Sequence, residues 1–460
     1  MHESEEYIMN GKKVLVFGMA RSGIAAAKLL LLRGNETWVC DGKKLEDFKG
    51  ALDEVLRMGA QPMLGEAHPE EKLEGFDMLL ISPGIPVDHP AVVKAKALGI
   101  EVVGEIEYAY REAKGLLLAI TGTNGKTTTV TLLGEIFKNA GFTTHVVGNI
   151  GVPYSGAVPA MTAADVTVCE ISSFMMETSS EFHPHVAAVL NISEDHLNRH
   201  GTMECYISLK ERIFERCDEN DFVVLNWDDE VTRGMAARAK CVPVYFSSRE
   251  EVPYGAFAKD GRVIFRMDGT DTDVCGTEEL YIPGEHNLRN ALAACAMAML
   301  CDIPADIVRH TFITFKGVEH RIEFTREVDG VRYINDSKGT NVDSTIQAVR
   351  AMKAPTVLIL GGYDKHCDFT PLVKVIQENP MIEHIVLIGV TAKQIADTLD
   401  KCGYTAYEHC GTDFEYCVRR CRELAQAGGN VLFSPACASF DMFSDYESRG
   451  RIFKEIVRKL

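Results

Sequence analysis

The sequence predicts an α/β protein of three domains, and three observations support this fold class. The chain has 460 residues, which corresponds to about three domains of ~150 residues each. Short runs rich in β-branched residues alternate with helical stretches through glycine-containing turns, which is typical of a mostly parallel sheet covered by helices. This alternation runs through the chain three times. Hydrophobic residues make up 46% of the chain and charged residues 25%, as in ordinary globular domains.

Residues 1–105 form the first block, for which we predict a Rossmann-like N-terminal domain. Alanine and leucine recur after the first apolar run in a pattern typical of a helix, which we expect to begin near Ser22. The short apolar and β-branched runs of this block are predicted as strands at 13–18, 37–41, 77–81 and 101–104.

The second block, 106–317, is predicted as a central domain with a parallel sheet, and the third, 318–460, as a C-terminal Rossmann-like α/β domain. Segment 243–282 is richer in turns and short strands, and a helix is predicted from near Asn287. The predicted strands of the central domain are 116–123, 166–172, 186–193 and 222–229. Those of the C-terminal domain are 331–336, 356–362, 384–390 and 430–436.

The composition excludes several classes of function. With 48 Lys and Arg against 66 Asp and Glu, the formal net charge is −18, so phosphate backbones repel the chain and no nucleic-acid partner is expected. No apolar run approaches the ~20 residues that cross a bilayer. The acidic start of the chain lacks the basic and apolar regions of a signal peptide. We therefore expect no membrane partner and a cytoplasmic location.

The cysteines support the same location. All 14 are scattered, and none belongs to a C-x-x-C pair. Thiols spread in this way along a long chain are typical of a reduced cytoplasmic protein. A zinc site needs clustered ligands, so the cysteine spacing does not predict one.

The most informative segment is the turn 121–128, TGTNGKTT, between an apolar strand and a helical run. Successive backbone N–H groups in such a turn form a concave anion site, and the helix N-terminus adds partial positive charge. Lys126 is expected to reach the β- and γ-phosphates of a nucleotide, and the Thr127 hydroxyl to bind Mg²⁺. The strict phosphate-loop pattern requires glycine where Ile120 stands. The placement between strand and helix nevertheless favours a P-loop ATPase-like domain over a simple glycine–asparagine turn.

This variant of the phosphate loop resembles that of the muramyl ligases and of their relative, folylpolyglutamate synthase. The resemblance extends from the first strand to the last helix, and the D-N-P-R motif of the diaminopimelate-adding members is absent. The segments 335–345, 361–365 and 434–443 are most similar to those of the D-glutamate-adding members. The other motifs that agree in order and spacing are GNIG at 148–151, EISSF at 170–174, NISEDH at 191–196, GEHNLRNALAA at 284–294 and EHRIE at 319–323.

The resemblance implies an ATP-dependent amide-bond ligase of peptidoglycan precursor synthesis. ATP would phosphorylate the alanyl carboxylate of UDP-N-acetylmuramoyl-L-alanine, and the amine of D-glutamate would attack the resulting acyl phosphate. The implied cofactor is Mg²⁺ at two sites. Both molecules that the enzyme would join are small. Because no heptad pattern requires a coiled-coil partner, we expect a monomer.

The resemblance assigns catalysis to Lys126, Glu170, His196 and Lys210. Glu170, at a strand end, would bind Mg²⁺ together with Thr127, and His196 would bind the second Mg²⁺. Lys210 would be carbamylated, because a carbamate can coordinate or orient a cation that an ammonium would repel. Without the resemblance, Glu170 is equally a surface carboxylate, His196 a packed histidine and Lys210 a solvated helix lysine.

The resemblance also assigns residues to ATP and to D-glutamate. Asn287 and Asn290 are alternatively helix N-caps, and 434–439 is alternatively a buried strand-to-turn segment. The implied ATP-binding residues are Gly122, Thr123, Asn124, Gly125, Lys126, Thr127, Thr128, Asn287, Asn290, Arg321 and Asp336. The implied D-glutamate-binding residues are Lys338, Thr340, Lys365, Ser439, Phe440 and Tyr446, where charge-assisted hydrogen bonds would hold the two carboxylates.

The nucleotide-sugar site is assigned to the first block and to the cleft beside the phosphate loop. Segment 18–23 is similar to a dinucleotide fingerprint, but Ala20 replaces its middle glycine, and Asp41 stands where a ribose-binding acid would lie. NAD binding is therefore an alternative for this block alone. The implied UDP-sugar residues are Arg21, Ser22, Asp41, Lys43, Ser82, Pro83, Gly84, Asn149, Ser172, Ser173 and Arg199, with Tyr206 lining the same cleft; several are alternatively turn or capping residues.

Other functions remain open at this point. A sister muramyl ligase, or one similar to folylpolyglutamate synthase, would share the phosphate loop but add a different unit. An inactive nucleotide-binding scaffold would be expected to lack Lys126, Glu170 or His196, and all three are present. An NAD-dependent oxidoreductase would need neither the phosphate loop nor the third block.

Overall fold

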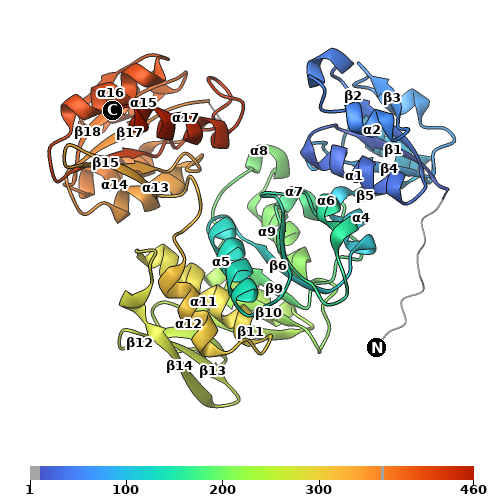
Figure 1. The fold of residues 1–460 in the computed structure, drawn as a ribbon, viewed down its shortest axis with the longest axis horizontal. Helices are drawn as coiled ribbons and strands as arrows, with labels where there is room; N and C mark the ends of the chain where they lie inside the picture. The colour runs from blue at the N-terminus through green and yellow to red at the C-terminus, as the bar shows by residue number, and fades with distance from the viewer. Residues whose placement is uncertain (1–10, 364–366) are drawn as a thin grey trace. The chain divides into compact units, whose positions relative to one another are not determined.

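The computed structural model describes residues 11–363 and 367–460, which fold into two compact units. The first unit comprises the described chain up to Tyr281 together with Asn287–Phe315. The second comprises Ile282–His286 and Lys316–Leu460. Figure 1 shows three separate sheets, each accompanied by helices, as the predicted three-domain α/β fold requires. No described helix has the length and apolar character that crossing a membrane requires.

The first sheet has five parallel strands in the order β3-β2-β1-β4-β5. Alternate residues of β1 enter different cores: Val14 and Val16 pack with α1, whereas Leu15 and Phe17 pack with α3. Because both faces are covered, the strand is apolar throughout. The elements are β1 (Lys13–Phe17), α1 (Arg21–Leu32), β2 (Glu36–Asp41), α2 (Asp53–Arg57), β3 (Gln61–Leu64), β4 (Met78–Ile81), α3 (Pro90–Ala97), β5 (Glu101–Gly104) and α4 (Glu105–Glu112).

The second sheet has nine strands in the order β14-β13-β12-β11-β10-β9-β6-β8-β7. The strands from β7 to β12 are parallel to their neighbours, so their carboxyl ends lie at one edge and their amino ends at the other. The strands are β6 (Leu116–Thr121), β7 (Thr144–Gly148), β8 (Val166–Glu170), β9 (Val186–Val189), β10 (Phe222–Asn226), β11 (Val242–Ser247), β12 (Gly255–Lys259), β13 (Arg262–Met267) and β14 (Thr270–Gly276). The helices are α5 (Lys126–Asn139), α6 (Tyr154–Ala157), α7 (Ser173–Met176), α8 (Leu197–His200), α9 (Met203–Glu211), α10 (Glu230–Met235), α11 (Glu285–Met299) and α12 (Ala305–Thr314).

The third sheet, in the second unit, has six strands in the order β15-β16-β20-β17-β18-β19, and only the β15–β16 pair is antiparallel. Leu358 and Leu360 of β17 pack with α14 and α15, whereas Val357 and Ile359 pack with α16 and α17. The elements are β15 (Glu323–Val328), β16 (Val331–Asn335), α13 (Val342–Ala351), β17 (Thr356–Leu360), α14 (Thr370–Glu378), β18 (Ile382–Leu387), α15 (Ala392–Lys401), β19 (Tyr407–His409), α16 (Phe414–Leu424), β20 (Asn430–Phe433) and α17 (Tyr446–Arg458).

Each strand predicted from the sequence is present, and the helices predicted near Ser22 and Asn287 are α1 and α11. The sequence pattern did not predict β3, β7, β15 and β19. All four lie at the edges of their sheets, where one side of the strand faces solvent and an apolar run is not needed. The predicted domain boundary at residue 105 falls inside the first unit, and that at 317 lies beside the division between the units. The three domain ranges remain predictions.

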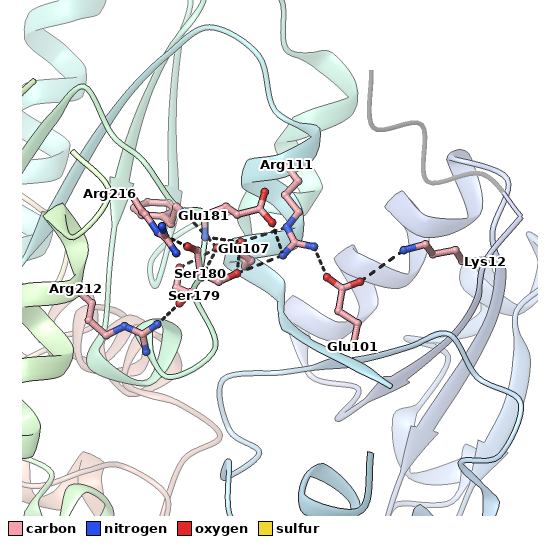
Figure 2. A network of polar contacts seen from close by, with 10 residues as sticks. Lys12, Glu101, Glu107, Arg111, Ser179, Ser180, Glu181, Arg212 and Arg216 are labelled. Atoms are coloured by element: carbon pink, nitrogen blue, oxygen red, sulfur yellow. Dashed lines mark hydrogen bonds and ion pairs between the residues drawn. The ribbon is translucent and has the colours of Figure 1, made fainter. Parts of the chain in front are cut away.

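A buried carboxylate of α4 fixes the loop that leads into β9. The side chain of Glu107 is completely buried, and it accepts hydrogen bonds from the backbone N–H groups of residues 180–182 at 2.9–3.2 Å. Arg111, one turn further along α4, contacts the carboxylate at 3.2 Å. From the other side, Arg212 and Arg216 donate to carbonyl oxygens of the same loop (Figure 2). The linker helix α4 is thereby fastened to the second sheet.

We predict that Glu107→Gln lowers the free energy of unfolding by about 3 kcal/mol, because an amide cannot accept all these hydrogen bonds and leaves Arg111 without its buried charge partner. Urea unfolding followed by circular dichroism measures the change. The matched control is Glu181→Gln, since Glu181 also contacts Arg111 but is 63% exposed, and we expect a change within about 0.5 kcal/mol there. Equal effects of the two substitutions would contradict the assignment.

Candidate active site

The turn after β6 places two glycines before α5. Gly122 and Gly125 have φ angles of 146° and 87°, which other residues rarely adopt. A Cβ atom on Gly125 would lie 2.3 Å from Oδ1 of Asn290, so the turn packs closely on α11. Asn191, just after β9, accepts from the N–H of Asn124 at 2.8 Å and donates to its carbonyl at 2.9 Å. The turn is thus held from two sides in the conformation predicted for an anion site.

Glu170, at the carboxyl end of β8, lies beside Thr127 of α5. Its Oε2 accepts a hydrogen bond from Thr127 Oγ1 at 2.8 Å, and its Oε1 accepts one from Nδ2 of Asn149 at 2.8 Å. The carboxylate is buried. A carboxylate and a hydroxyl at this spacing are the hard oxygen donors that Mg²⁺ prefers, so the residues fit such an ion. The structure therefore brings together the two residues predicted to share the first Mg²⁺.

Two lysine side chains meet at one carbonyl oxygen. Lys126 Nζ and Lys210 Nζ each donate to the carbonyl of Gly122 at 2.8 Å. Lys210, on α9, is only 2% exposed, and its Nζ lies 4.7 Å from the ring centroid of Tyr206. Burial, together with the neighbouring Lys126 ammonium, lowers the pKa of Lys210 well below its ordinary value. This burial excludes the alternative of a solvated helix lysine.

The loop between β9 and α8 carries His196. This residue has a φ angle of 55°, and its ring centroid lies 4.7 Å from that of Phe174. Its Nε2 is 3.5 Å from Oδ2 of Asp195, and its side chain is 37% exposed. A histidine next to a carboxylate is compatible with the predicted second cation, and Asp195 is a further oxygen donor there.

The two serines predicted to face the substrate, Ser172 and Ser173, differ in their hydrogen-bond partners. Ser173 Oγ forms a hydrogen bond of 2.9 Å with Nε2 of His200, a buried histidine whose pKa is lowered by burial. Ser172 Oγ is buried and has no hydrogen-bond partner among the described residues. An unsatisfied hydroxyl at the end of β8, close to Glu170 in sequence, is what a site for a polar ligand requires.

The residues of the first sheet predicted to bind the UDP-sugar gather at the carboxyl ends of β1, β2 and β4. Asp41 accepts hydrogen bonds from the N–H groups of Met19 and Lys43 at 2.7 and 2.9 Å, and Ser82 Oγ donates to the carbonyl of Gly18 at 2.5 Å. Asp41 therefore fixes two loops of the predicted site by backbone contacts. The other predicted residues at this edge are Arg21, Ser22, Pro83 and Gly84.

Arg199 joins this edge to the loops of the second sheet. Its guanidinium contacts the carboxylate of Glu177 at 2.5 and 3.1 Å and donates to the carbonyl of Ile85 at 3.1 Å. A pocket between the loops is lined by residues of both sheets, among them Ser82, Pro83, Glu105, Phe174 and Glu177. Of the predicted substrate residues, Ser82 lines this pocket, whereas Arg199 contacts two of its lining residues, Ile85 and Glu177, and its charge is paired with Glu177.

Asn290 and Asn287 lie within the first two turns of α11, which begins at Glu285. Neither is therefore the N-cap of this helix, and that alternative is wrong. Asn290 is buried against Gly125, so α11 and the phosphate loop share an interface. Asn287 stands one turn earlier on the same helix.

In the second unit, Asp336 is completely buried directly after β16. Its Oδ2 accepts a hydrogen bond from Ser434 Oγ at 2.6 Å, and its Oδ1 lies 3.7 Å from NH1 of Arg321. Burial raises the pKa of Asp336, an effect that the guanidinium of Arg321 opposes. The two residues predicted to hold the nucleotide from this unit therefore form one ion pair.

Arg449, on α17, connects the two loops predicted to bind D-glutamate. The guanidinium is 1% exposed and donates to Oγ and the carbonyl of Ser337 at 3.0 and 2.8 Å. It also donates to the carbonyls of Cys437 and Ala438 at 3.1 and 3.0 Å. Burial lowers the pKa of Arg449 to about 10, so the group remains charged at neutral pH. The loop after β16 is thereby tied to the loop after β20.

The predicted D-glutamate residues lie on these two loops and on α17. Lys338 Nζ donates to the hydroxyl of Tyr446 at 3.3 Å and lies 5.0 Å from the centroid of its ring. On the other loop Ser439 is buried, whereas Phe440 is 66% exposed. The N–H of Thr340 donates to the carbonyl of Lys338 at 2.9 Å, which closes the turn. Lys365 lies outside the described residues.

Several residues of the site were not predicted from the sequence. They act through the backbone or through other side chains, and their burial becomes visible only once the loops are folded. The motif NISEDH at 191–196 contained two of them. The residues are Asn191, Asp195, Glu177, His200 and Arg449.

Three family models match successive parts of the chain. They are the MurD-like N-terminal domain of Mur ligases at residues 12–104, the Mur ligase middle domain at 120–298 and the Mur ligase glutamate ligase domain at 320–437. A relative from Thermoanaerobacter sp. (strain X514), named UDP-N-acetylmuramoylalanine–D-glutamate ligase, is 46% identical over 454 residues, covering 98% of this chain and 99% of its own. This chain belongs to the Mur ligase family.

Other Mur ligases agree with this assignment. A UDP-N-acetylmuramoylalanine–D-glutamate ligase from Lachnospira eligens is 45% identical over 453 residues, covering 98% of this chain and 100% of its own. Among solved structures, MurC from Thermotoga maritima has a TM-score of 0.62 at 19% identity, covering 97% of this chain and 99% of that one. MurF from Acinetobacter baumannii also has a TM-score of 0.62, at 18% identity, covering 97% of this chain and 93% of that one. The structures establish the shared three-domain fold.

As a Mur ligase, the protein is an enzyme that uses ATP and Mg²⁺ and acts on small-molecule substrates. The residues present fit these groups. Thr127 and Glu170 provide oxygen donors for Mg²⁺, and the turn 121–128 provides the anion site for phosphates.

We predict that Arg449→Lys lowers the free energy of unfolding of the second unit by about 2 kcal/mol. An ammonium has three donors on a point charge and cannot satisfy four acceptors arranged around a planar guanidinium. Denaturant unfolding monitored by hydrogen exchange in residues 434–439 measures the effect. Arg451→Lys on the same helix, where the arginine is 57% exposed, is the control and should unfold like the parent. Unchanged exchange in the Arg449 variant would refute the tie between the loops.

Proposed function

We propose that the chain joins D-glutamate to UDP-N-acetylmuramoyl-L-alanine at the expense of ATP, by way of an acyl phosphate. Relatives named UDP-N-acetylmuramoylalanine–D-glutamate ligase match over almost the whole chain, which favours the D-glutamate-adding activity over that of a sister ligase. We assign UDP-sugar binding to residues 1–105, ATP binding to 106–317 and D-glutamate binding to 318–460. In this proposal the enzyme acts as a cytoplasmic monomer, with neither nucleic acid nor membrane as a partner.

The contact between Thr127 and Glu170 is the observation on which the proposal depends. Phosphoryl transfer to a carboxylate brings two anions together, so the site must offset their repulsion. Lys126 and the N-terminus of α5 present positive charge to the phosphates, and Thr127 and Glu170 provide the donors for a cation between the reactants. Bound Mg²⁺ would neutralise charge on the transferred phosphate. Asn149 keeps the Glu170 carboxylate oriented through its hydrogen bond.

The second unit supplies the groups that an amino acid with two carboxylates needs. Lys338 provides a cation, and Ser439 and Thr340 provide hydroxyls. Arg449 holds the two loops together but is itself fully engaged, so its role is to position the loops. The ion pair of Arg321 and Asp336 is assigned to the nucleotide.

The surroundings of Lys210 support the proposal that it is carbamylated. A buried amine whose pKa is lowered is unprotonated more often at neutral pH and can attack CO₂. The ammonium first loses one proton; the neutral amine then forms an N–C bond to CO₂ as one C–O π bond breaks, and a second proton leaves the nitrogen to solvent, so that the side chain passes from a positive through a neutral to a negative charge. That change removes the repulsion with Lys126 and adds an oxygen donor close to Asp195; we assign this donor, with His196, to a second Mg²⁺.

The substrate assignment is tested by measuring ADP release and amide product with UDP-N-acetylmuramoyl-L-alanine, ATP and a panel of amino acids. We expect turnover with D-glutamate but not with L-glutamate, L-alanine or a diamino acid. Lys126→Ala, which removes the cation of the phosphate loop, should lower kcat by about 10³-fold or more. Turnover with another amino acid alone, or undiminished synthesis by the Lys126 variant, would contradict the proposal.

The carbamate is tested with Lys210→Arg, which keeps a cation of similar length but cannot react with CO₂. We expect activity to fall by about 10²-fold or more. In ¹³C NMR with labelled bicarbonate, the parent enzyme should show a carbamate carbon that the variant lacks. Signal and activity should decline together as the pH falls, because protonation of the amine reverses the reaction.

Lys138→Arg, at an exposed position of α5, is the control and should keep both the carbamate carbon and full activity. Full activity of the Lys210 variant, or a carbamate carbon that persists in it, would rule out the modification of Lys210.

A further inference from the structure

Histidine, cysteine and aspartate side chains gather at the amino ends of three neighbouring parallel strands. His183 and His185 precede β9, Asp221 directly precedes β10, and Cys241 directly precedes β11. Cys217 lies in the segment that leads to β10. Because β9, β10 and β11 are parallel, these positions share one edge of the sheet. The phosphate loop follows the carboxyl end of β6 and belongs to the opposite edge, so this group is separate from the site of phosphoryl transfer.

Three of these side chains converge on one point, and Cys241 stands at the start of the neighbouring strand. The potential ligand atoms of His183, Cys217 and Asp221 all lie within 4.8 Å of one another. Nε2 of His183 is 2.5 Å from Oδ2 of Asp221, and the buried side chains of Cys217 and Cys241 belong to the same core cluster beside them. Around a tetrahedral ion with bonds of about 2.0–2.3 Å, ligand atoms are roughly 3.3–3.8 Å apart, so small side-chain movements reach that geometry.

The backbone around the group is fixed independently of any ligand. The loop immediately before His183 is held by Glu107, Arg212 and Arg216, the network in Figure 2. Cys217 directly follows Arg216, and its Sγ lies 3.2 Å from the carbonyl of Pro184. The ligand positions are therefore held before a metal binds, which lowers the entropic cost of binding.

His185 supports the group without joining it. Its Nδ1 lies 3.1 Å from Oδ1 of Asp221, the oxygen that does not face His183. This is the arrangement in which an outer hydrogen bond orients a ligating carboxylate. The two histidines are about a third exposed, whereas both thiols are buried, so an ion has a path from solvent to the sulfur atoms.

We propose that His183, Cys217, Asp221 and Cys241 bind a divalent metal ion of the zinc class. Two sulfurs and an imidazole exclude a preference for Mg²⁺ or Ca²⁺, which take oxygen donors, and favour Zn²⁺. Binding replaces the protons of both thiols and the proton between His183 and Asp221, so it releases protons to solvent. The ion would join the starts of three strands, and its role is structural.

Glu319, His320 and Glu323 form a second group of potential metal ligands among the described residues. This group differs from the first because a lysine lies beside it. Lys454 Nζ lies 2.5 Å from Glu319 and 2.9 Å from Glu323, so an ammonium already occupies the position of a cation there. No comparable cation contacts Asp221 among its described ion pairs, which are with histidines. The group at the amino ends of β9 to β11 is therefore the better metal site.

The test uses the full chain, reduced, free of metal and without nucleotide, titrated with Co²⁺. We expect one equivalent to produce visible bands of a tetrahedral ion and a near-ultraviolet thiolate-to-cobalt band, both displaced by Zn²⁺. Cys217→Ser and Cys241→Ser should each weaken the thiolate band, and His183→Ala should lower Co²⁺ affinity by about 10-fold or more. Cys205→Ser, which removes an exposed thiol of α9, is the control and should match the parent.

Two results would overturn the metal site. One is a titration whose spectrum lacks the thiolate band or keeps it unchanged when either cysteine is replaced. The other is a Cys217–Cys241 disulfide in protein purified without added oxidant, found by mass spectrometry of peptides, since a disulfide leaves no thiolate for a metal. Zn²⁺ should also raise the Tm of the parent but not of His183→Ala, a substitution at a half-buried position that leaves the ligase residues unchanged.

Discussion

The arrangement of charge around the carbonyl of Gly122 is the constraint on which the site depends. Two lysines donate to this one oxygen, and one of them is almost completely buried. Such a concentration of positive charge is unstable in isolation, because burial and mutual repulsion both oppose it. The repulsion is relieved when Lys210 loses its proton, which its lowered pKa favours, or when anions such as the phosphates of ATP bind beside the two amines. Three features of the site agree with this balance of charge: the turn, the burial of Lys210 and the nearby carboxylates of Glu170 and Asp195.

The parallel part of the nine-stranded second sheet separates two kinds of chemistry. At the carboxyl ends of its strands the chain places Glu170, the phosphate loop and the loop of His196, which is the usual location of ligand sites in such sheets. At the amino ends it places thiols and imidazoles, which favour softer metals. Oxygen donors at one edge and sulfur donors at the other would keep Mg²⁺ and a zinc-class ion in their own sites, because each ion prefers the donors of its own edge.

The sequence was sufficient for the fold class, for the central strands and for the turn between β6 and α5, because apolar runs and the phosphate-loop motif are local patterns. Strand ends were predicted too long, since residues such as Ile171 and Leu190 continue the apolar run into the loops beyond β8 and β9. The edge strands β3, β7, β15 and β19 were missed because few of their residues are fully buried. Residues that act by long-range contact, such as Asn191 and Arg449, have no local pattern. The cysteines are scattered in the sequence, and only the topology of the fold brings Cys217 and Cys241 together.

In the second unit, two loops are ordered by one buried cation, the guanidinium of Arg449. Its guanidinium is buried with four hydrogen bonds, and all four acceptors are neutral oxygens rather than a carboxylate. The positive charge therefore orders two loops without being cancelled at short range, and because its pKa is about 10 it persists at neutral pH. Lys338 adds a second cation on one of these loops. Asp336 and Asp441 attract the guanidinium from further away, so the region holds charges of both signs, and what Arg449 contributes is a fixed geometry of the two loops rather than a free charge.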